Sequence, residues 1–332
     1  MTDAPCVLGV DSGGSGMRVA LGLPDKADRP AAVSSNEPVR TGARGIDAGH
    51  FIEQLLPMAR GLLAQAGAGR VTAVAVGAAG MATLGDDLRA QLPGALHEAL
   101  GVRRLALAAD AVTAYAGALG DRPGAVVAAG TGMIAIGTDL AAWQRADGWG
   151  HLLGDCGGGA WIGRAGLEAA MRAFDGRRGG SKALLARAEE LFGPAPGLPG
   201  ELYPRTDRPA MLASFAPEVA HCVPDDPVAE AILREAARHI AEAAAAVCPA
   251  SDAAGQGEQP EVALTGGLFK MGDALLGPVR AELKGLLRHV RLVTAAGDPL
   301  DGALRIAADT GADRLRLPLD ARMLTLHTEY DS

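Results

Sequence analysis

The chain has little cysteine, few aromatic side chains and no long apolar run. Its four cysteines lie far apart, with neither a CxxC motif nor a cysteine–histidine cluster, which argues against a disulfide framework or a zinc site and favours a reducing cytoplasm. No stretch reaches about 18 uninterrupted apolar residues, and no basic segment precedes the first apolar strand. We therefore expect a cytoplasmic protein that is neither secreted nor membrane-spanning. The cysteines are Cys6, Cys156, Cys222 and Cys248.

Basic residues form no block along the chain. There are 31 lysines and arginines against 39 aspartates and glutamates, so the net charge is −8 and nucleic acid is a poor candidate as a partner. A hydrophobic fraction of 48% and a charged fraction of 21% are typical of globular proteins. A chain of 332 residues suits two domains of about 150 residues each. We predict domains over 1–120 and 121–332, in a monomer or homodimer.

Glycine, by contrast, is abundant, with 46 residues against three Trp, three Tyr and five Phe. Glycine is costly to order and is retained where the backbone must approach something closely. Three glycine turns each follow an apolar strand, at Gly13–Gly16, Gly130–Gly132 and Gly266–Gly267, and the first two contain the hydroxyl residues Ser15 and Thr131. Bare N–H groups beside a hydroxyl can cradle phosphate oxygens. Neither a Walker A motif nor a GxGxxG that opens a helix is present.

The first half of the chain is expected to contain a mixed sheet covered by helices, in the order β, β, α, β, α, β. In the second half, strands should flank a glycine turn, and a helix should be capped by aspartate and proline. The expected strands are 6–10, 17–22, 71–76, 104–109, 125–129, 134–137 and 261–265; the expected helices are 49–66, which Pro57 should kink or shorten, 111–119, 227–248 and 272–287; exposed loops are expected over 194–209 and 249–260.

The sequence Gly14–Met17 is similar to Gly130–Met133, and each lies between two apolar strands. The separation is close to the size of one domain, which indicates an internal duplication. A chance match in a glycine-rich chain is the alternative.

Three segments resemble the phosphate-1, phosphate-2 and adenosine motifs of the actin, hexokinase and heat-shock ATPase superfamily: Val7–Ser15, Ala129–Gly132 and Leu264–Gly267. More narrowly, Gly148–Asp155 together with Trp161–Gly163 resembles the BadF/BadG-type group, which contains N-acetylglucosamine kinase and bacterial glucosamine kinases. The resemblance extends from residue 6 to about residue 310.

The resemblance implies an α/β protein of two ribonuclease-H-like lobes, the actin-like ATPase fold, with ATP and a sugar in an interlobe active-site cleft. It implies that Asp11 holds Mg²⁺ through water, whereas a turn-forming aspartate is the alternative. The final helix near 300–312 is expected to pack back on the amino-terminal lobe. The ATP-binding residues that the resemblance implies are Ser12, Gly13, Gly14, Ser15, Gly16, Gly130, Thr131, Gly132, Gly266 and Gly267.

All three tryptophans fall between residues 143 and 161. Trp161, and with it Trp143, is expected to belong to a small hydrophobic core. Glycines flank Trp149 on both sides, which favours an exposed indole on which a pyranose ring could stack. With the resemblance, the predicted sugar site consists of Gly80, Asp110, Gly148, Trp149 and Asp155.

Asp110 is the predicted catalytic base. It lies between the strand 104–109 and the helix 111–119, where a carboxylate can orient a sugar hydroxyl and accept its proton. The resemblance places the base of the sugar kinases at this junction. A helix N-cap is the alternative role, and the two can coexist.

The sugar pocket departs from the family pattern. No asparagine lies in Arg40–Gly45, and Cys156 and Gly158 replace the usual acidic residue and serine. These changes weaken N-acetylglucosamine as the substrate and favour transfer of the γ-phosphate of ATP to the 6-hydroxyl of glucosamine, with N-acetylglucosamine kinase as the alternative. The stretch containing Arg164, Arg172 and Arg177 resembles the glucosamine kinase branch, but it could equally be a solvated helix face.

The sequence argues against two other functions. An activator ATPase of this superfamily needs cysteines for an iron–sulfur cluster, and Cys156 has no second cysteine near it in the sequence. A sugar-sensing transcription regulator needs a DNA-binding domain before the first phosphate motif, and only ten residues precede Asp11. The expected partners are therefore ATP with Mg²⁺ and an amino sugar, with no membrane and no nucleic acid.

Overall fold

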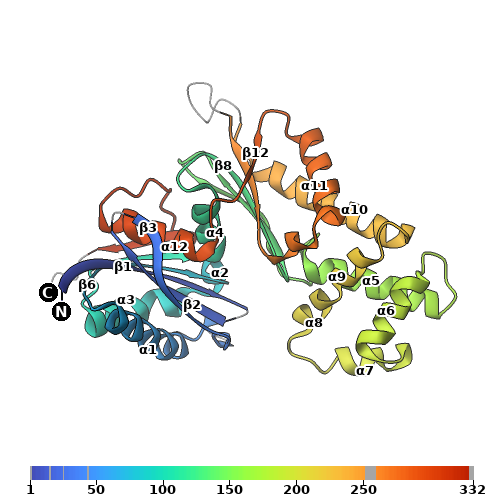
Figure 1. Cartoon of the computed structure of the whole chain (residues 1–332), viewed down its shortest axis with the longest axis horizontal. Coiled ribbons are helices and arrows are strands. Elements are labelled where there is room, and N and C mark those ends of the chain that lie inside the picture. The colour runs from blue at the N-terminus through green and yellow to red at the C-terminus, as the bar shows by residue number, and fades with distance from the viewer. Residues whose placement is uncertain (1, 15, 25, 43–44, 251–258, 329–332) are drawn as a thin grey trace. The chain divides into compact units, whose positions relative to one another are not determined.

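In the computed structural model, internal contacts divide the chain into two units, each with its own sheet and helices (Figure 1). The first unit comprises Met1–Gly124, Thr138–Trp143 and Val293–Ser332, and the second comprises Ala125–Gly137 and Gln144–Leu292. The units differ from the predicted domains chiefly because 293–332 belongs to the first unit. The structure describes residues 2–14, 16–24, 26–42, 45–250 and 259–328.

The sheet of the first unit has the strand order β13-β7-β6-β1-β2-β3. β1 is antiparallel to β2 and parallel to β6, which is parallel to β7. The apolar run Cys6–Val10 is buried along its whole length, as expected for a strand covered on both faces. The strands are β1 (Thr2–Gly13), β2 (Gly16–Leu23), β3 (Lys26–Ser35), β6 (Ala68–Ala78), β7 (Arg104–Ala109) and β13 (Leu324–Thr328), with a separate small pair, β4 (Thr41–Gly42) and β5 (Gly45–Ile46).

Helices cover both faces of this sheet, with α1 and α3 on one side and α4 and α12 on the other (Figure 1). α1 begins after the N-cap Asp47 and ends at the left-handed Gly67, and it passes through Pro57. The expectation of a later start at Pro57 is therefore wrong, because packing of the apolar face outweighs one lost backbone hydrogen bond. The helices are α1 (Ala48–Ala66), α2 (Met81–Leu84), α3 (Asp86–Leu100), α4 (Asp110–Leu119) and α12 (Pro299–Gly311).

The sheet of the second unit has the order β10-β9-β8-β11-β12. If the strands of each sheet are numbered in chain order, both sheets have the spatial order 3-2-1-4-5. The first sheet has one further strand, β13, beside β7. This shared order supports the predicted duplication. The strands are β8 (Gly124–Ala129), β9 (Met133–Thr138), β10 (Trp143–Asp147), β11 (Glu261–Thr265) and β12 (Arg291–Thr294).

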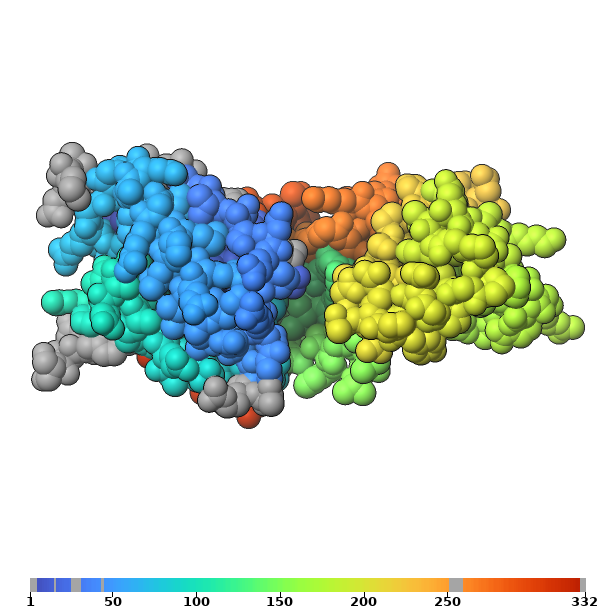
Figure 2. Space-filling model, turned by 90° about the horizontal axis from the view of Figure 1, so that it is seen from below, coloured from blue at the N-terminus to red at the C-terminus, as the bar shows by residue number. Residues whose placement is uncertain are grey.

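One hydrophobic core joins this second sheet to its helices. α10 starts as predicted, because the Asp226 carboxylate accepts hydrogen bonds from two N–H groups of the first turn and Pro227 follows it. The helices α6 to α9 form the surface that is yellow-green to yellow in Figure 2. The helices are α5 (Gly159–Phe174), α6 (Lys182–Phe192), η1 (Ala195–Gly197), α7 (Leu198–Leu202), α8 (Arg208–Ser214), α9 (Ala216–His221), α10 (Pro227–Val247), η2 (Gly267–Met271) and α11 (Asp273–Leu286).

The predicted loop over 194–209 is in part wrong. It contains η1, α7 and the start of α8, and each of these helices has proline in its first turn. Proline suits the first turn of a helix, where its missing N–H has no intrahelical partner. Most of the second predicted loop, 251–258, lies outside the described residues. Within the part of the chain that is described, no helix has the length and apolarity to cross a bilayer.

Candidate active site

The first glycine turn joins β1 to β2, with Gly13 paired to Gly16. A Cβ on Gly13 or Gly14 would meet nothing within 4 Å, so the backbone here is open to a ligand. Gly16 has a different reason to be glycine: its φ is +126°, and a Cβ would lie 2.0 Å from the carbonyl oxygen of Ser35 on β3. Ser15, also predicted to bind ATP, lies outside the described residues.

A pocket of about 120 Å³ lies beside this turn, within the first unit. Its size suits a phosphate group better than a whole sugar, since pockets for complete small molecules are several times larger. The backbone oxygen of Ser12 accepts a hydrogen bond from the N–H of Ala79 (2.8 Å), which joins the ends of two strands here. The lining residues are Ser12, Gly13, Gly14, Pro38, Val39, Thr41, Ile46, Ala78 and Ala79.

Asp11, the predicted metal ligand, lies on β1 directly opposite Arg18 on β2. Arg18 donates two hydrogen bonds to Oδ2 of Asp11 (3.0 and 2.5 Å) and one to Oδ2 of Asp298 at the start of α12 (2.9 Å). Burial raises the pKa of Asp11, and the Asp298 carboxylate adds to the rise, whereas the hydrogen bond and charge of Arg18 oppose it. Arg18 thus links two carboxylates that would otherwise repel each other.

The surroundings of Asp11 fit a magnesium ion that is shared with a substrate. Mg²⁺ is usually held by one or two carboxylates together with water and phosphate oxygens. Among the described residues, no three His, Cys, Asp or Glu side chains gather into a metal site. Both hydrogen bonds from Arg18 go to Oδ2, so Arg18 does not occupy Oδ1. Asp11 therefore fits a role beside water and phosphate, not a place in a protein cage.

Asp110 begins α4, and Ala109 is the N-cap of that helix. The N-cap role considered for Asp110 is therefore wrong by one position, although Oδ1 of Asp110 accepts a hydrogen bond from the N–H of Ala111 (3.0 Å). In the parallel strands, Ser12 pairs with Ala78, and Ala78 with Ala109. The residues that follow these three, Gly13, Ala79 and Asp110, consequently lie side by side at the carboxyl-terminal ends of the strands, at one edge of the sheet.

This edge brings together three predicted features of the first unit: the open turn at Gly13, the loop containing Gly80, and Asp110. Two strand spacings separate the first and third, a distance of about 10 Å. Gly80 has φ +80° and is the N-cap of the short helix α2.

In the second unit, the turn Gly130–Gly132 is held against the start of α5. The N–H of Gly159 donates to the oxygen of Gly130 (2.9 Å), and that of Ala160 donates to Thr131 (2.8 Å). A Cβ on Gly130 would meet nothing within 4 Å, whereas one on Gly132 would lie 2.3 Å from the Asp155 carboxylate. The turn is thus open at Gly130 and closed at Gly132.

The predicted phosphate-2 and adenosine turns lie side by side in this unit. Gly266 has φ +107°, and a Cβ there would lie 2.2 Å from the oxygen of Ala129, the residue before Gly130. Gly267 faces open space.

Trp149 is 62% exposed, as predicted, and the guanidinium carbon of Arg145 lies 4.0 Å from the centroid of its ring. Trp161 packs on the core and makes an edge contact with His239, and Trp143 makes a similar contact with Tyr115. The prediction that Trp149 differs from the other two tryptophans is therefore confirmed.

Asp155 is half-buried in the same loop as Trp149 and Gly148. Its Oδ1 accepts a hydrogen bond from the N–H of Gly150 (3.0 Å). Burial raises the pKa of Asp155, and the nearby Asp147 carboxylate adds to the rise, whereas the hydrogen bond from Gly150 opposes it. Gly148 has φ +73°, and a Cβ there would lie 2.7 Å from the side chain of Ile134.

Residues 8–284 match the family described as the BadF/BadG/BcrA/BcrD ATPase family. The match covers well over half of the chain and includes all three glycine turns. The chain belongs to the BadF/BadG/BcrA/BcrD ATPase family. The resemblance inferred from the motifs is thereby confirmed.

Two solved structures of other proteins have a fold similar to that of this chain. A candidate N-acetylglucosamine kinase from Chromobacterium violaceum is 29% identical, with a TM-score of 0.68 over 91% of this chain and 98% of that chain. A ROK family glucokinase from Streptomyces griseus, in complex with glucose and AMPPNP, is 19% identical with a TM-score of 0.57, over 91% of this chain and 98% of that chain. The predicted α/β class with two ribonuclease-H-like lobes, the actin-like ATPase fold, is confirmed.

A curated relative resembles part of the chain. The N-acetylmuramic acid/N-acetylglucosamine kinase of Clostridium acetobutylicum is 42% identical over 77 residues, which are 23% of this chain and 24% of that protein. The aligned part thus spans about a quarter of that relative's length.

Three charged residues that contact predicted site residues were not predicted from the sequence: Arg18, Asp298 and Asp147. A signal for Arg18 exists, because pairing Gly13 with Gly16 places Asp11 opposite Arg18, and opposite charges favour such cross-strand positions. Asp298, three residues before Asp301, belongs to a capping box at α12, but nothing local indicates its contact with Arg18. The Asp147 contacts depend on the folded loop.

Arg164 and Arg172 of α5, and Arg177 just after this helix, are exposed to solvent, in agreement with the alternative of a solvated surface. Arg172 pairs with Glu168 (2.8 Å), and Arg177 pairs with Asp175 (3.0 Å). Arg164 lies 4.0 Å from Glu168. These exposed pairs stabilise the fold by little.

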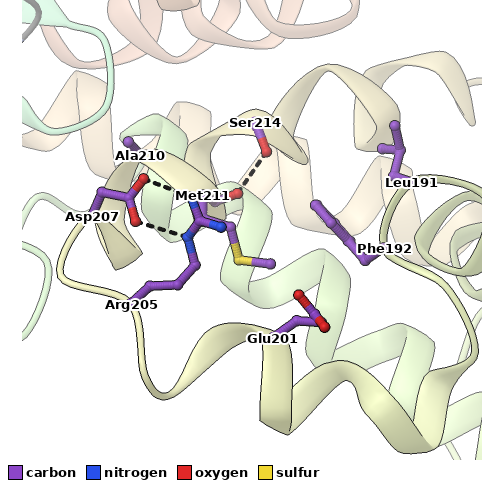
Figure 3. A pocket seen from close by; sticks show the side chains of 8 residues that line it. All are labelled: Leu191, Phe192, Glu201, Arg205, Asp207, Ala210, Met211 and Ser214. Atoms are coloured by element: carbon purple, nitrogen blue, oxygen red, sulfur yellow. Dashed lines mark hydrogen bonds and ion pairs between the residues drawn. The ribbon is translucent and has the colours of Figure 1, made fainter.

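A larger hollow of about 510 Å³ lies among α6, α7 and α8 and contains none of the predicted site residues (Figure 3). Its most basic side chain, Arg205, is held by two hydrogen bonds to the Asp207 carboxylate (both 2.7 Å), so the charge is already neutralised. This hollow is therefore not the phosphate site. The lining residues are Leu191, Phe192, Glu201, Arg205, Asp207, Ala210, Met211 and Ser214.

Proposed function

We propose that the protein is an ATP-dependent kinase that transfers the γ-phosphate of ATP to the 6-hydroxyl of an amino sugar. The observation that carries the proposal is the edge of the first sheet, where Asp110 shares one line of strand ends with the open turn at Gly13. A carboxylate beside an open phosphate cradle is the arrangement that phosphoryl transfer to a hydroxyl requires. Membership of an ATPase family supports the use of ATP.

In the proposed mechanism, Asp110 orients the sugar hydroxyl and accepts its proton as the phosphoryl group is transferred. The backbone N–H groups of the turns at Gly13 and Gly130 hold the phosphates. Asp11, held by Arg18, would hold Mg²⁺ together with water. When bound, Mg²⁺ neutralises the charge of the phosphate oxygens.

Trp149 and Asp155 are the proposed sugar residues of the second unit. The exposed indole offers an apolar face to a pyranose ring. Glucosamine is charged at its 2-amino group near neutral pH, and an acidic site favours it. N-acetylglucosamine fits at least as well on other grounds, because the similar proteins from C. violaceum and C. acetobutylicum are described as acting on that sugar.

The test is a coupled ADP-release assay with glucosamine, N-acetylglucosamine, N-acetylmuramic acid and glucose. We expect amino sugars to have the highest kcat/KM, and phosphorus NMR to show a 6-phosphate. A tenfold preference for glucosamine, about 1.4 kcal/mol, would assign it as the substrate. The reverse preference would assign N-acetylglucosamine, and no ADP release with any sugar would contradict the proposed function.

A further inference from the structure

The loop that carries Trp149 has an unusual backbone. Five of its residues have positive φ, two of which are aspartates: Asp147 (59°), Gly148 (73°), Gly150 (84°), Asp155 (55°) and Gly157 (86°). Aspartate enters this region more readily than most residues other than glycine, but it does so at a cost that its surroundings must offset. The contacts that hold the loop therefore matter for its shape.

Asp147 closes the loop upon itself. Its Oδ1 accepts a hydrogen bond from the N–H of Asp155 (2.6 Å), and its Oδ2 accepts one from the N–H of Cys156 (2.9 Å). Both carboxylate oxygens are thus bound to backbone groups eight and nine residues further along the chain. Hydrogen bonds to a charged acceptor are about twice as strong as neutral ones.

Gly154 lies close to both Asp147 and Trp149. A Cβ on Gly154 would lie 2.3 Å from Oδ1 of Asp147 and 3.0 Å from Cβ of Trp149, so the loop has no room for a side chain at this position. From β10, Arg145 donates to the backbone oxygens of Asp147 (3.1 Å) and Gly148 (3.3 Å) and stacks on the indole. One face of the indole is therefore covered by Arg145, and the loop holds the Arg145 guanidinium through two backbone oxygens.

We propose that Asp147 is a positioning residue for the sugar: by closing the 147–156 loop, it fixes the indole of Trp149 in a conformation ready for the pyranose ring. This inference rests on the proposed function. A platform fixed before binding raises affinity because less order has to be created when the ligand arrives. Asp147 itself touches neither the sugar nor the phosphates.

The variants Asp147→Asn and Asp147→Gly test the role without adding backbone strain, because asparagine and glycine both tolerate the left-handed region. We expect KM for the amino sugar to rise about tenfold, while KM for ATP and kcat stay within about twofold. Asp139→Asn is the matched control. The Asp139 carboxylate also accepts two backbone hydrogen bonds, from Ala141 (2.9 Å) and Ala142 (3.1 Å), but it lies in a turn of the first unit.

Hydrogen exchange gives a second readout that does not need activity. In Asp147→Gly, which removes both acceptors, the amides of Asp155 and Cys156 should exchange at least tenfold faster than in the wild type, with the core strands of the second unit unchanged. In Asp147→Asn, which keeps one oxygen acceptor, at least one of these two amides should do so.

The inference would be overturned if the KM for the amino sugar were unchanged in both variants, or if the KM for the sugar and the KM for ATP rose equally. Unchanged hydrogen exchange at the amides of Asp155 and Cys156 would also overturn it. The proposed function fails separately: in that case the wild type phosphorylates no amino sugar, and the role of Asp147 towards the sugar fails with it. If the wild type is active and the variants keep its KM, only the inference is wrong.

Discussion

Asp110 begins α4 with one carboxylate oxygen already bound to the backbone N–H of Ala111. The asparagine variant keeps that oxygen as an acceptor but cannot take up a proton from a hydroxyl. We expect Asp110→Asn to melt within about 2 °C of the wild type. Its kcat should fall by about 10²-fold or more. Scanning calorimetry measures the melting temperature, and the ADP-release assay measures kcat.

Asp86→Asn is the control for this change. Asp86 is also the first residue of a helix, α3, and its side chain is exposed. That variant should keep normal kcat. Near-normal kcat in Asp110→Asn itself would show that Asp110 is a structural residue only.

The raised pKa of Asp155 predicts that the stability of the fold depends on pH. Its pKa is raised above the ordinary value of 3.8, chiefly by burial, so the folded state favours the protonated form. This contribution is fully present below the unfolded-state pKa and is lost as the pH rises through the raised folded-state pKa. Asp155→Asn, which does not ionise but keeps an oxygen for the N–H of Gly150, should therefore gain stability relative to the wild type as the pH rises.

Urea unfolding of both proteins between about pH 4 and pH 8 measures this difference. The free energies of unfolding should converge at the acid end, and the variant should be the more stable protein at the alkaline end. A variant that is less stable than the wild type by a constant amount at every pH would refute the expectation.

At the scale of elements, α4 and α12 lie unusually close. A Cβ on Gly302 would lie 1.9 Å from the backbone oxygen of Thr113, and one on Gly117 would lie 2.1 Å from that of Asp298. Backbone atoms cannot move aside as a flexible side chain can, so the two helices must separate if either glycine gains a side chain. This contact fixes α12 on the face of the sheet that carries Asp11.

Gly302→Ala should consequently lower the free energy of unfolding by about 1–3 kcal/mol or more. Gly61→Ala is the matched control, since Gly61 lies within α1, is not followed by proline, and a Cβ there would meet nothing within 4 Å. Alanine favours a helix over glycine, so the control should gain up to about 1 kcal/mol. Equal effects of the two changes on chemical denaturation would argue against the close contact.

At the scale of the whole molecule, the first unit is assembled from separate parts of the chain. α12 packs on β1 and β6, and β13 pairs with β7 and forms the edge of the sheet. A chain that stops after Thr294 keeps β12 but loses both elements, so that only α4 still covers that face of the first sheet.

We expect this shortened chain to lose hydrogen-exchange protection in β1 and β6, while β8 and β11 of the second unit stay protected. A peptide of residues 295–328, added in trans, should restore part of the lost protection. Full protection of β1 in the shortened chain without the peptide would show that the first unit folds without its last segment.

The sequence by itself determined the features that depend on neighbouring residues. Apolar runs interrupted by Gly13–Gly16 and Gly130–Gly132 predict two hairpins, and both are present. The exposure of Trp149 followed from its flanking glycines. These features could be predicted because strand propensity, turn geometry and helix capping act over a few residues.

Only the tertiary structure decided which distant groups meet. Arg18 contacts Asp298, 280 residues further along the chain. The carboxylate of Asp147 finds its partners among backbone N–H groups that are left without a strand or helix partner when the loop folds. The physical reason is that a charged side chain pairs with whatever unsatisfied group the fold brings within about 3 Å, and local sequence does not encode that proximity.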